Sequence, residues 1–146
     1  MTVWSRIRES VIGKRNALSL GQRGERAAER FLSRRGFKIV ARGYSNHVGE
    51  IDLIGIDVRS KPRTVVFVEV KTRQTDLRGL PVEAVDERKQ RQITETAMVY
   101  LRQHHLLENR FRFDIIGIMW PEETRRPEIN HYMNAFEPTG RGQLFA

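Results

Sequence analysis

The chain has 146 residues, of which 26 are Lys or Arg and 18 are Asp or Glu, giving a formal net charge of +8. With 39% hydrophobic and 30% charged residues it has the composition of a globular domain, long enough to bury a two-layer core. Cysteine is absent, which excludes disulfide scaffolds, zinc knuckles, thiol nucleophiles and iron–sulfur clusters. Because no membrane span or signal peptide is recognisable, we expect a cytoplasmic protein without membrane contact. Its basic surplus favours nucleic acid as a partner.

Composition divides the chain into three parts. Residues 1–18 form a basic N-terminal arm, residues 19–137 a single domain, and residues 138–146 a C-terminal tail. We see no internal repeat within the domain.

The domain is predicted to open with a helix. Ser19 and Gln22 have the spacing of a capping box, and the helix should run to about Arg35, where Gly36 supplies a stop. Glu25 lies on the same stripe as the apolar residues of this helix, although an unpaired buried carboxylate is costly. This conflict makes Glu25 a candidate functional residue.

Three strands are predicted next. The last of them is a near-continuous apolar run, which is typical of a central, buried strand. Short connections indicate that the three are antiparallel neighbours. The predicted strands are Phe37–Arg42, Glu50–Ile56 and Thr64–Lys71.

A long second helix is predicted to begin at Pro81, followed by acidic residues that suit a helix N-terminus. The apolar stripe of this helix is interrupted at Lys89. Two further strands, Phe111–Met119 and Ile129–Phe136, follow it. A strand, a helix and another strand imply a right-handed crossover and a parallel pair. The predicted fold class is therefore α/β, a mixed sheet flanked by helices in the order α-β-β-β-α-β-β.

Charged residues interrupt the predicted core at two neighbouring strands. Glu69 and Lys71 point to the same face of their strand, and Asp52 can stand opposite them. Two carboxylates about 4 Å apart repel by roughly 4 kcal/mol at an effective dielectric of 20, so a proton, a lysine or a cation must offset them. Oxygen ligands without cysteine favour Mg²⁺ or Mn²⁺, which Asp52, Glu69 and the carbonyl of Val70 can hold.

Such a centre suits hydrolysis of phosphodiester bonds. Lys71 can orient a water or stabilise developing negative charge, and Glu25 and Lys89 reach the same place from the two helices. The alternative is structural: Glu69 and Lys71 form a same-face ion pair at an exposed strand end, and Asp52 is merely solvated. Charged residues on several inward faces favour one common site.

Two segments carry a family resemblance, GEIDLI at 49–54 and VFVEVKTR at 66–73. Together they resemble the YraN-like family, a bacterial group with a restriction-endonuclease-like fold. They are also similar to the archaeal Holliday-junction resolvases of the PD-(D/E)XK nuclease superfamily. The resemblance spans about Gly21 to Phe136.

The resemblance implies a role for each charged residue. Asp52 and Glu69 would be the metal carboxylates, Lys71 the catalytic lysine, and Glu25 the additional helix acid of the resolvases. Ile51 stands where the superfamily pattern has proline. Resolvase-type enzymes act on two strands, so a homodimer is consistent with the resemblance.

Two hypotheses follow. The first is an endonuclease that requires Mg²⁺ or Mn²⁺ and cuts DNA, including branched DNA. The second is a module on a nuclease fold that binds nucleic acid without cutting it. Metal uptake that depends on the carboxylates would discriminate between them.

The remaining polar residues are weaker candidates. Asp114 either faces the site or pairs with an arginine, and His47 is expected in an exposed loop. Aromatic residues are 8% of the chain and are assigned to strands and helix faces, so base stacking is not expected to dominate binding. Basic residues expected to contact phosphate around the site are Arg34, Arg35, Lys38, Arg42, Arg59, Lys61, Arg63, Arg73 and Arg78.

Overall fold

A computed structural model describes residues 18–75, 79–122 and 125–139. Most of the predicted arm and tail lies outside the described residues. In chain order the elements are α2 (Leu20–Arg34), β1 (Phe37–Ser45), β2 (Glu50–Asp57), β3 (Thr64–Arg73), the 3₁₀ helix η1 (Pro81–Ala84), α3 (Glu87–Gln103), β4 (Phe111–Met119) and β5 (Glu128–Phe136). This succession confirms the predicted fold class.

The five strands form one mixed sheet in the order β1-β2-β3-β4-β5, so β1 and β5 are its edges. The pairs β1–β2, β2–β3 and β4–β5 are antiparallel, whereas β3 and β4 are parallel. The parallel pair is joined through η1 and α3, as the strand, helix and strand pattern predicts. Two interruptions lie at the edges: the β1–β2 register shifts between Ile39 and Ala41, and Asn134 in β5 has a φ of 50°.

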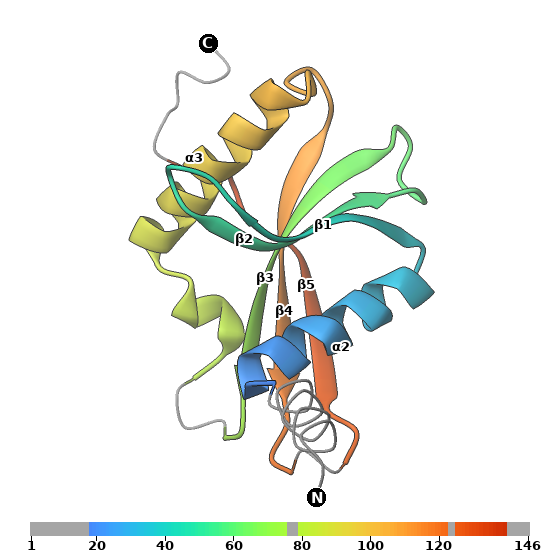
Figure 1. Cartoon of the computed structure of the whole chain (residues 1–146), viewed down its shortest axis with the longest axis vertical. Helices are drawn as coiled ribbons and strands as arrows, with labels where there is room; N and C mark the ends of the chain where they lie inside the picture. Colours follow the sequence, from blue (N-terminus) through green and yellow to red (C-terminus); the bar gives the residue numbers. More distant parts are fainter. Residues whose placement is uncertain (1–17, 76–78, 123–124, 140–146) are drawn as a thin grey trace, which may run out of the picture.

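The two described α-helices cover opposite faces of the sheet (Figure 1). Alternate side chains of β3 divide between these faces, because successive strand residues point in opposite directions. Phe67 joins the core beneath α3, where it meets Ile93 and Leu101. Val66 joins the second core, beneath α2, together with Leu32. Both faces of β3 are therefore buried, as its apolar run predicts.

The helix α2 begins as its capping box predicts. The backbone N–H of Gln22 donates to Ser19 Oγ at 3.1 Å, and the Ser19 N–H donates to Gln22 Oε1 at 3.0 Å. At the other end Gly36 has a φ of 92°, a left-handed conformation that ends the helix. Among the described helices, none is long and apolar enough to cross a membrane.

The predicted start of the second helix at Pro81 is wrong. The residues from Pro81 form only the short helix η1, and the chain leaves helical geometry at Val85 (φ −102°, ψ 84°). The helix α3 instead begins after Asp86, whose carboxylate accepts the Lys89 N–H at 2.9 Å. An aspartate N-cap satisfies an otherwise unpaired helix donor, which proline cannot do. Lys89 consequently lies in the first turn of α3.

Candidate functional site

The strands β2 and β3 part at the segment that carries the predicted site. Their last registered pair is Leu53 and Val68. Beyond it, the Val70 N–H donates to Asp52 Oδ2 at 2.8 Å, so a side chain takes the place of a backbone acceptor. The N–H and C=O of one strand residue point to the same side, and the Val70 carbonyl therefore also faces Asp52. This places two kinds of oxygen, carboxylate and carbonyl, at the opening between the strands.

Glu69 is the buried acid of this opening. Its exposed fraction is 7%, and Lys71 Nζ and Lys89 Nζ lie 3.3 and 3.9 Å from its Oε1. Lys71 comes from the same strand, two residues on, and Lys89 from the first turn of α3. Both lysine side chains keep about a third of their surface exposed (27% and 36%), so each can also reach a ligand.

Glu25 approaches from the opposite face of the sheet, on α2. Glu25 and Asp52 both line a small hollow of about 180 Å³. Burial raises the pKa of Glu25, and the charge of Asp52 and a hydrogen bond to it raise that pKa further. The acids from α2 and β2 therefore form one electrostatic unit.

The pKa of Glu69 is also raised. Burial is the main cause, the charge of Asp52 adds to it, and Lys89 and Lys71 only partly offset the two. Burial and a like charge both disfavour the ionised form. The lysines alone thus leave the negative charge of this cluster incompletely compensated.

The structure brings together all five side chains that the sequence singles out: Glu25, Asp52, Glu69, Lys71 and Lys89. Their catalytic and metal-binding roles stay predictions. No three Asp, Glu or His side chains among the described residues form a group that could hold a metal ion unaided. That is compatible with Mg²⁺, which keeps several waters and takes only one or two protein carboxylates. The donors Asp52, Glu69 and the Val70 carbonyl fit such an ion.

Gly24 positions Glu25, a role that sequence reasoning missed. The residue is buried against β3, and a Cβ built on it would lie 1.7 Å from Thr72 Oγ1. Only glycine lets α2 approach β3 this closely, and the next residue then reaches Asp52. Glycine is unfavourable inside a helix. Its presence within the predicted helix was therefore the one signal in the sequence that could have revealed this close packing.

We expect Gly24→Ala to lower the free energy of unfolding by about 1–3 kcal/mol, as overpacked cores do. Gly21→Ala is the matched control, because its nearest neighbour would be Ser19 Oγ at 3.9 Å. On an exposed helix position this change should instead stabilise the protein by up to about 1 kcal/mol. Urea unfolding of both variants gives the comparison. Stabilisation by Gly24→Ala would contradict the close approach.

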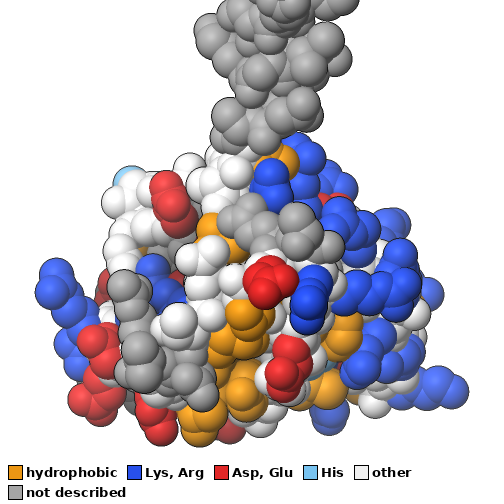
Figure 2. Space-filling view, turned by 90° about the horizontal axis from the view of Figure 1, so that it is seen from below, with side chains coloured by type: hydrophobic (Ala, Val, Ile, Leu, Met, Phe, Trp, Pro, Cys, Tyr) orange, Lys and Arg blue, Asp and Glu red, His pale blue; other side chains and the backbone are white. Residues whose placement is uncertain are grey.

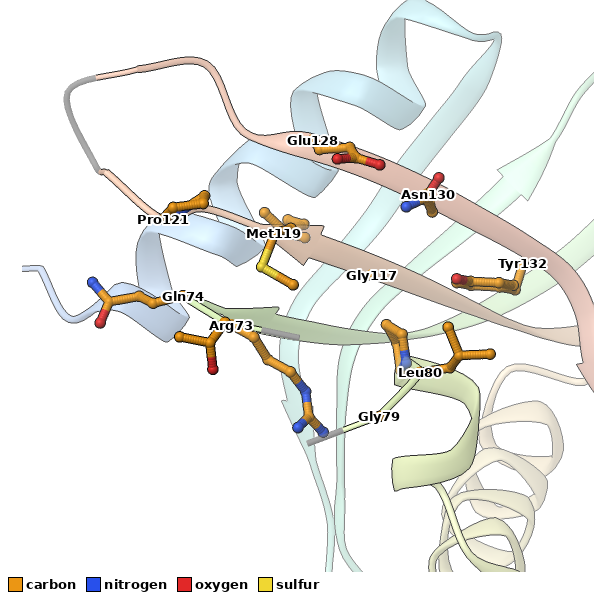
Figure 3. Close-up of a pocket in the computed structure, with 13 residues that line it drawn as sticks. Arg73, Gln74, Gly79, Leu80, Gly117, Met119, Pro121, Glu128, Asn130 and Tyr132 are labelled. Carbon is orange, nitrogen blue, oxygen red and sulfur yellow. The ribbon is translucent and has the colours of Figure 1, made fainter. Parts of the chain in front are cut away.

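A pocket of about 540 Å³ adjoins the site on the α3 side of the sheet (Figure 3). It is lined by Gly117, which is the β4 partner of Lys71. Arg73 extends from the end of β3 toward Gly79 and Leu80 (Figure 3). Its Nη1 is buried and has no hydrogen-bond partner among the described residues. An arginine N–H without a partner is suited to donate a hydrogen bond to an anionic oxygen.

Several basic residues do not lie where the sequence suggested. Arg59, Lys61 and Arg63 belong to the connection after β2, at the far end of the strand from Asp52. At about 3.3 Å per residue, Asp52 and Asp57 are already about 16 Å apart along β2, and the three basic residues lie beyond Asp57. The prediction that these three residues surround the site is therefore wrong. Arg42 is already paired with the carboxylate of Glu29, and Arg78 lies outside the described residues.

Asp114 pairs with an arginine and does not join the site. This buried carboxylate accepts hydrogen bonds from Arg112 Nε at 2.9 Å and from the Asn134 N–H at 2.9 Å. An ionised carboxylate only accepts, so His131 Nε2, 2.7 Å away, is its donor. Arg112 also reaches Asp57 at 3.1 Å. This network links β4 to β2 and β5 as a structural device. The exposed His47 is a loop residue, as expected.

Known proteins match most of this chain. The model of the uncharacterised protein family UPF0102 matches residues 24–118, which include every member of the charged cluster. A UPF0102 protein of Rhodopirellula baltica is 45% identical over 122 residues, or 83% of this chain and 72% of that protein. UPF0102 proteins of Caldanaerobacter subterraneus and Geotalea daltonii are 40% and 42% identical, over 84% and 86% of this chain and 98% and 94% of their own lengths.

Proposed function

The chain belongs to the uncharacterised protein family UPF0102, which confirms the YraN-like resemblance, and we propose that it is an endonuclease that requires a divalent cation and hydrolyses phosphodiester bonds in DNA. One observation carries the proposal: a buried acid, Glu69, lies between two lysines beside Asp52, where two strands part. The raised pKa values of Glu25 and Glu69 add support, because perturbed acids that lie close together favour a functional centre over a purely structural ion pair.

Asp52, Glu69 and the Val70 carbonyl would hold Mg²⁺ or Mn²⁺. When bound, the ion polarises a phosphoryl oxygen and lowers the pKa of a water. Lys71 orients the attacking water and stabilises negative charge as it develops on the phosphate. Lys89 favours the ionised form of Glu69 and partly offsets its burial, and Arg73 donates to a phosphate oxygen from the adjoining pocket. Glu25 holds a proton more readily than an ordinary glutamate, which makes it the group to deliver or accept one.

The net charge of +8 supports a polyanionic substrate. The resemblance of the segments at 49–54 and 66–73 to the motifs of Holliday-junction resolvases favours branched DNA in particular. The decisive assay uses labelled linear, flapped, single-stranded and four-way DNA with Mg²⁺, Mn²⁺ or EDTA. We expect cutting that needs the cation and is lost in Lys71→Ala.

The second candidate is a module that binds nucleic acid without cutting it. It is favoured by the lack, among the described residues, of three metal-type side chains in one group. Absence of cutting on every substrate, with salt-sensitive binding equal in the parent and Lys71→Ala, would replace the nuclease proposal by this one.

A cation should stabilise the protein in a way that depends on pH. The folded pKa values of Glu25 and Glu69 are raised, so protons and cations compete for these acids. In the metal-free protein both acids contribute stability below their unfolded pKa values, and that contribution is lost as the pH rises through their folded values. The increase in Tm on adding Mn²⁺ should therefore be larger at pH 7.5 than at pH 5.5. The control Asp52→Asn should show little increase, and an equal increase in both proteins would contradict the assigned ligands.

A further inference from the structure

A second concave surface lies beside α2, away from the charged cluster. It has a volume of about 670 Å³ and runs between the second half of α2 and the connection from β4 to β5. We call it the arginine groove. Its described lining residues are Ala27, Arg30, Phe31, Arg34, Arg35, Trp120, Arg125, Arg126, Pro127 and Ile129.

The groove is strongly basic. Five of its described lining residues are arginines, all of them exposed, and none of the described ones is acidic. Arg125 makes an ion pair with Glu122 at 3.1 Å, but both side chains are largely exposed (80% and 62%), so water weakens the pair. Figure 2 shows Lys and Arg side chains gathered on the side of the molecule where α2 lies. Such a concentration of like charge suits a polyanion.

Two aromatic side chains form part of the groove wall. Phe31 and Trp120 are each only partly buried. The Arg35 guanidinium lies 4.2 Å from the centre of the Phe31 ring, and Trp120 Nε1 donates to the Arg125 carbonyl at 2.7 Å. Guanidinium planes and indole rings both stack on nucleobases. Phe31 and Trp120 therefore give the groove two surfaces suited to stacking bases.

The ends of this chain are poor occupants. Residues 1–17 carry Arg6, Arg8, Lys14 and Arg15 against the single acid Glu9, and residues 140–146 carry Arg141 and no acid. Both have the same sign of charge as the groove. The ligand must supply negative charge together with planar apolar groups, and unpaired nucleotides supply both.

We propose that the arginine groove binds single-stranded DNA that extends from the substrate, so that the protein prefers flapped or branched DNA to blunt duplex. The statement that the bound strand extends from a substrate rests on the proposed nuclease function, whereas the binding of a single strand in the groove does not. Glu25 at the charged cluster and Arg34 in the groove belong to the same helix. At 1.5 Å per residue they are about 14 Å apart along its axis, within reach of one short strand.

The test measures binding of a fluorescent single strand in EDTA, where no cutting occurs. Arg30→Gln/Arg34→Gln should weaken binding by about tenfold and lower the slope of log K against log salt by about 1.4, the value for two phosphate contacts on a single strand. The matched control is Arg102→Gln/Arg110→Gln, which removes two exposed arginines elsewhere. Unchanged affinity in the groove variant, or an equal loss in the control, would overturn the proposal. So would an equal loss on blunt duplex.

Stacking has its own measurement. Trp4 and Trp120 are the only tryptophans of the chain, so Trp4→Phe leaves Trp120 as the sole indole. Its fluorescence should be quenched by the single strand, and the quenching should disappear in Arg30→Gln/Arg34→Gln. Strand binding without quenching would refute the groove as its site. Because these assays need no cleavage, an inactive nuclease centre would not change their results. A failed groove would remove the expected preference for flapped DNA but would leave the test of cation-dependent cutting unchanged.

Discussion

Glu69→Gln is expected to reduce DNA cleavage by about 1,000-fold while DNA binding is retained. The substitution keeps the size of the side chain but removes the charge that the two lysines face and that the proposed divalent cation would bind. Losses of this size are typical when one preorganised charged group of a hydrolytic site is removed. The measurement is single-turnover cleavage in Mg²⁺ or Mn²⁺, beside binding in EDTA.

The same substitution should stabilise the metal-free protein by about 1–2 kcal/mol, within the range of stabilising changes at functional sites. The raised pKa of Glu69 means that the ionised acid is disfavoured in the fold despite Lys71 and Lys89. Both lysines are partly exposed and can be solvated once their partner is neutral. Replacing Glu69 by glutamine therefore removes more desolvation and repulsion energy than it loses in ion-pair energy.

Glu108→Gln is the control, since this exposed acid lies in the connection after α3. This variant should cleave DNA at the parental rate and have the parental free energy of unfolding. If Glu69→Gln also cleaved DNA at the parental rate, Glu69 would have no part in the mechanism. A destabilised Glu69→Gln would show that its ion pairs outweigh its burial.

Asp114→Ala is expected to lower the free energy of unfolding by about 3–5 kcal/mol, the usual result of breaking a buried charged network on one side. The carboxylate is fully buried and accepts bonds from three residues on β4 and β5. Without this carboxylate, Arg112 loses its ion pair with Asp114 and keeps the one with Asp57, although its side chain is only 14% exposed. Urea unfolding at pH 7 measures the change.

The network should also shape the stability of the parent in acid. Burial by itself would raise the pKa of Asp114, but hydrogen bonds from His131, Arg112 and the Asn134 N–H hold that pKa below its usual value. A lowered folded pKa contributes stability above the unfolded value, and this is lost as the pH falls through the folded value. Unfolding measured from pH 5 downward should thus be steeper in the parent than in Asp114→Ala. Glu122→Ala, which breaks an exposed pair, should behave like the parent, and equal acid slopes in all three proteins would contradict this role of Asp114.

Much of the site could be predicted because it lies on strands. Side chains alternate along β3, so Glu69 and Lys71 had to share a face with Phe67, and a charge at the end of an apolar row is visible in sequence. Asp52 followed because the connection between β2 and β3 is short. The helix residues Glu25 and Lys89 were visible as charges on apolar stripes.

Other features depended on packing or on competing local signals. The close approach of Gly24 to Thr72 exists only once α2 lies on β3. The pairing of Arg42 with Glu29 joins two elements whose relative position the sequence does not state. The start of α3 was predictable in principle, because Asp86 is a better N-cap than the residues before Pro81. The competing signal is the proline, which suits the first turn of a helix and so predicts an earlier start.

The edges of the sheet bear on how copies of this chain can meet. An open sheet offers unpaired backbone groups along its outer strands, and flat edges invite aggregation by strand addition. Here β1 is interrupted beside Val40, between the exposed Lys38 and Arg42, and β5 is interrupted at Asn134. Bulges and charges of this kind discourage edge-to-edge pairing. Any association between copies of this chain is therefore expected to use helices and connections rather than extension of its sheet.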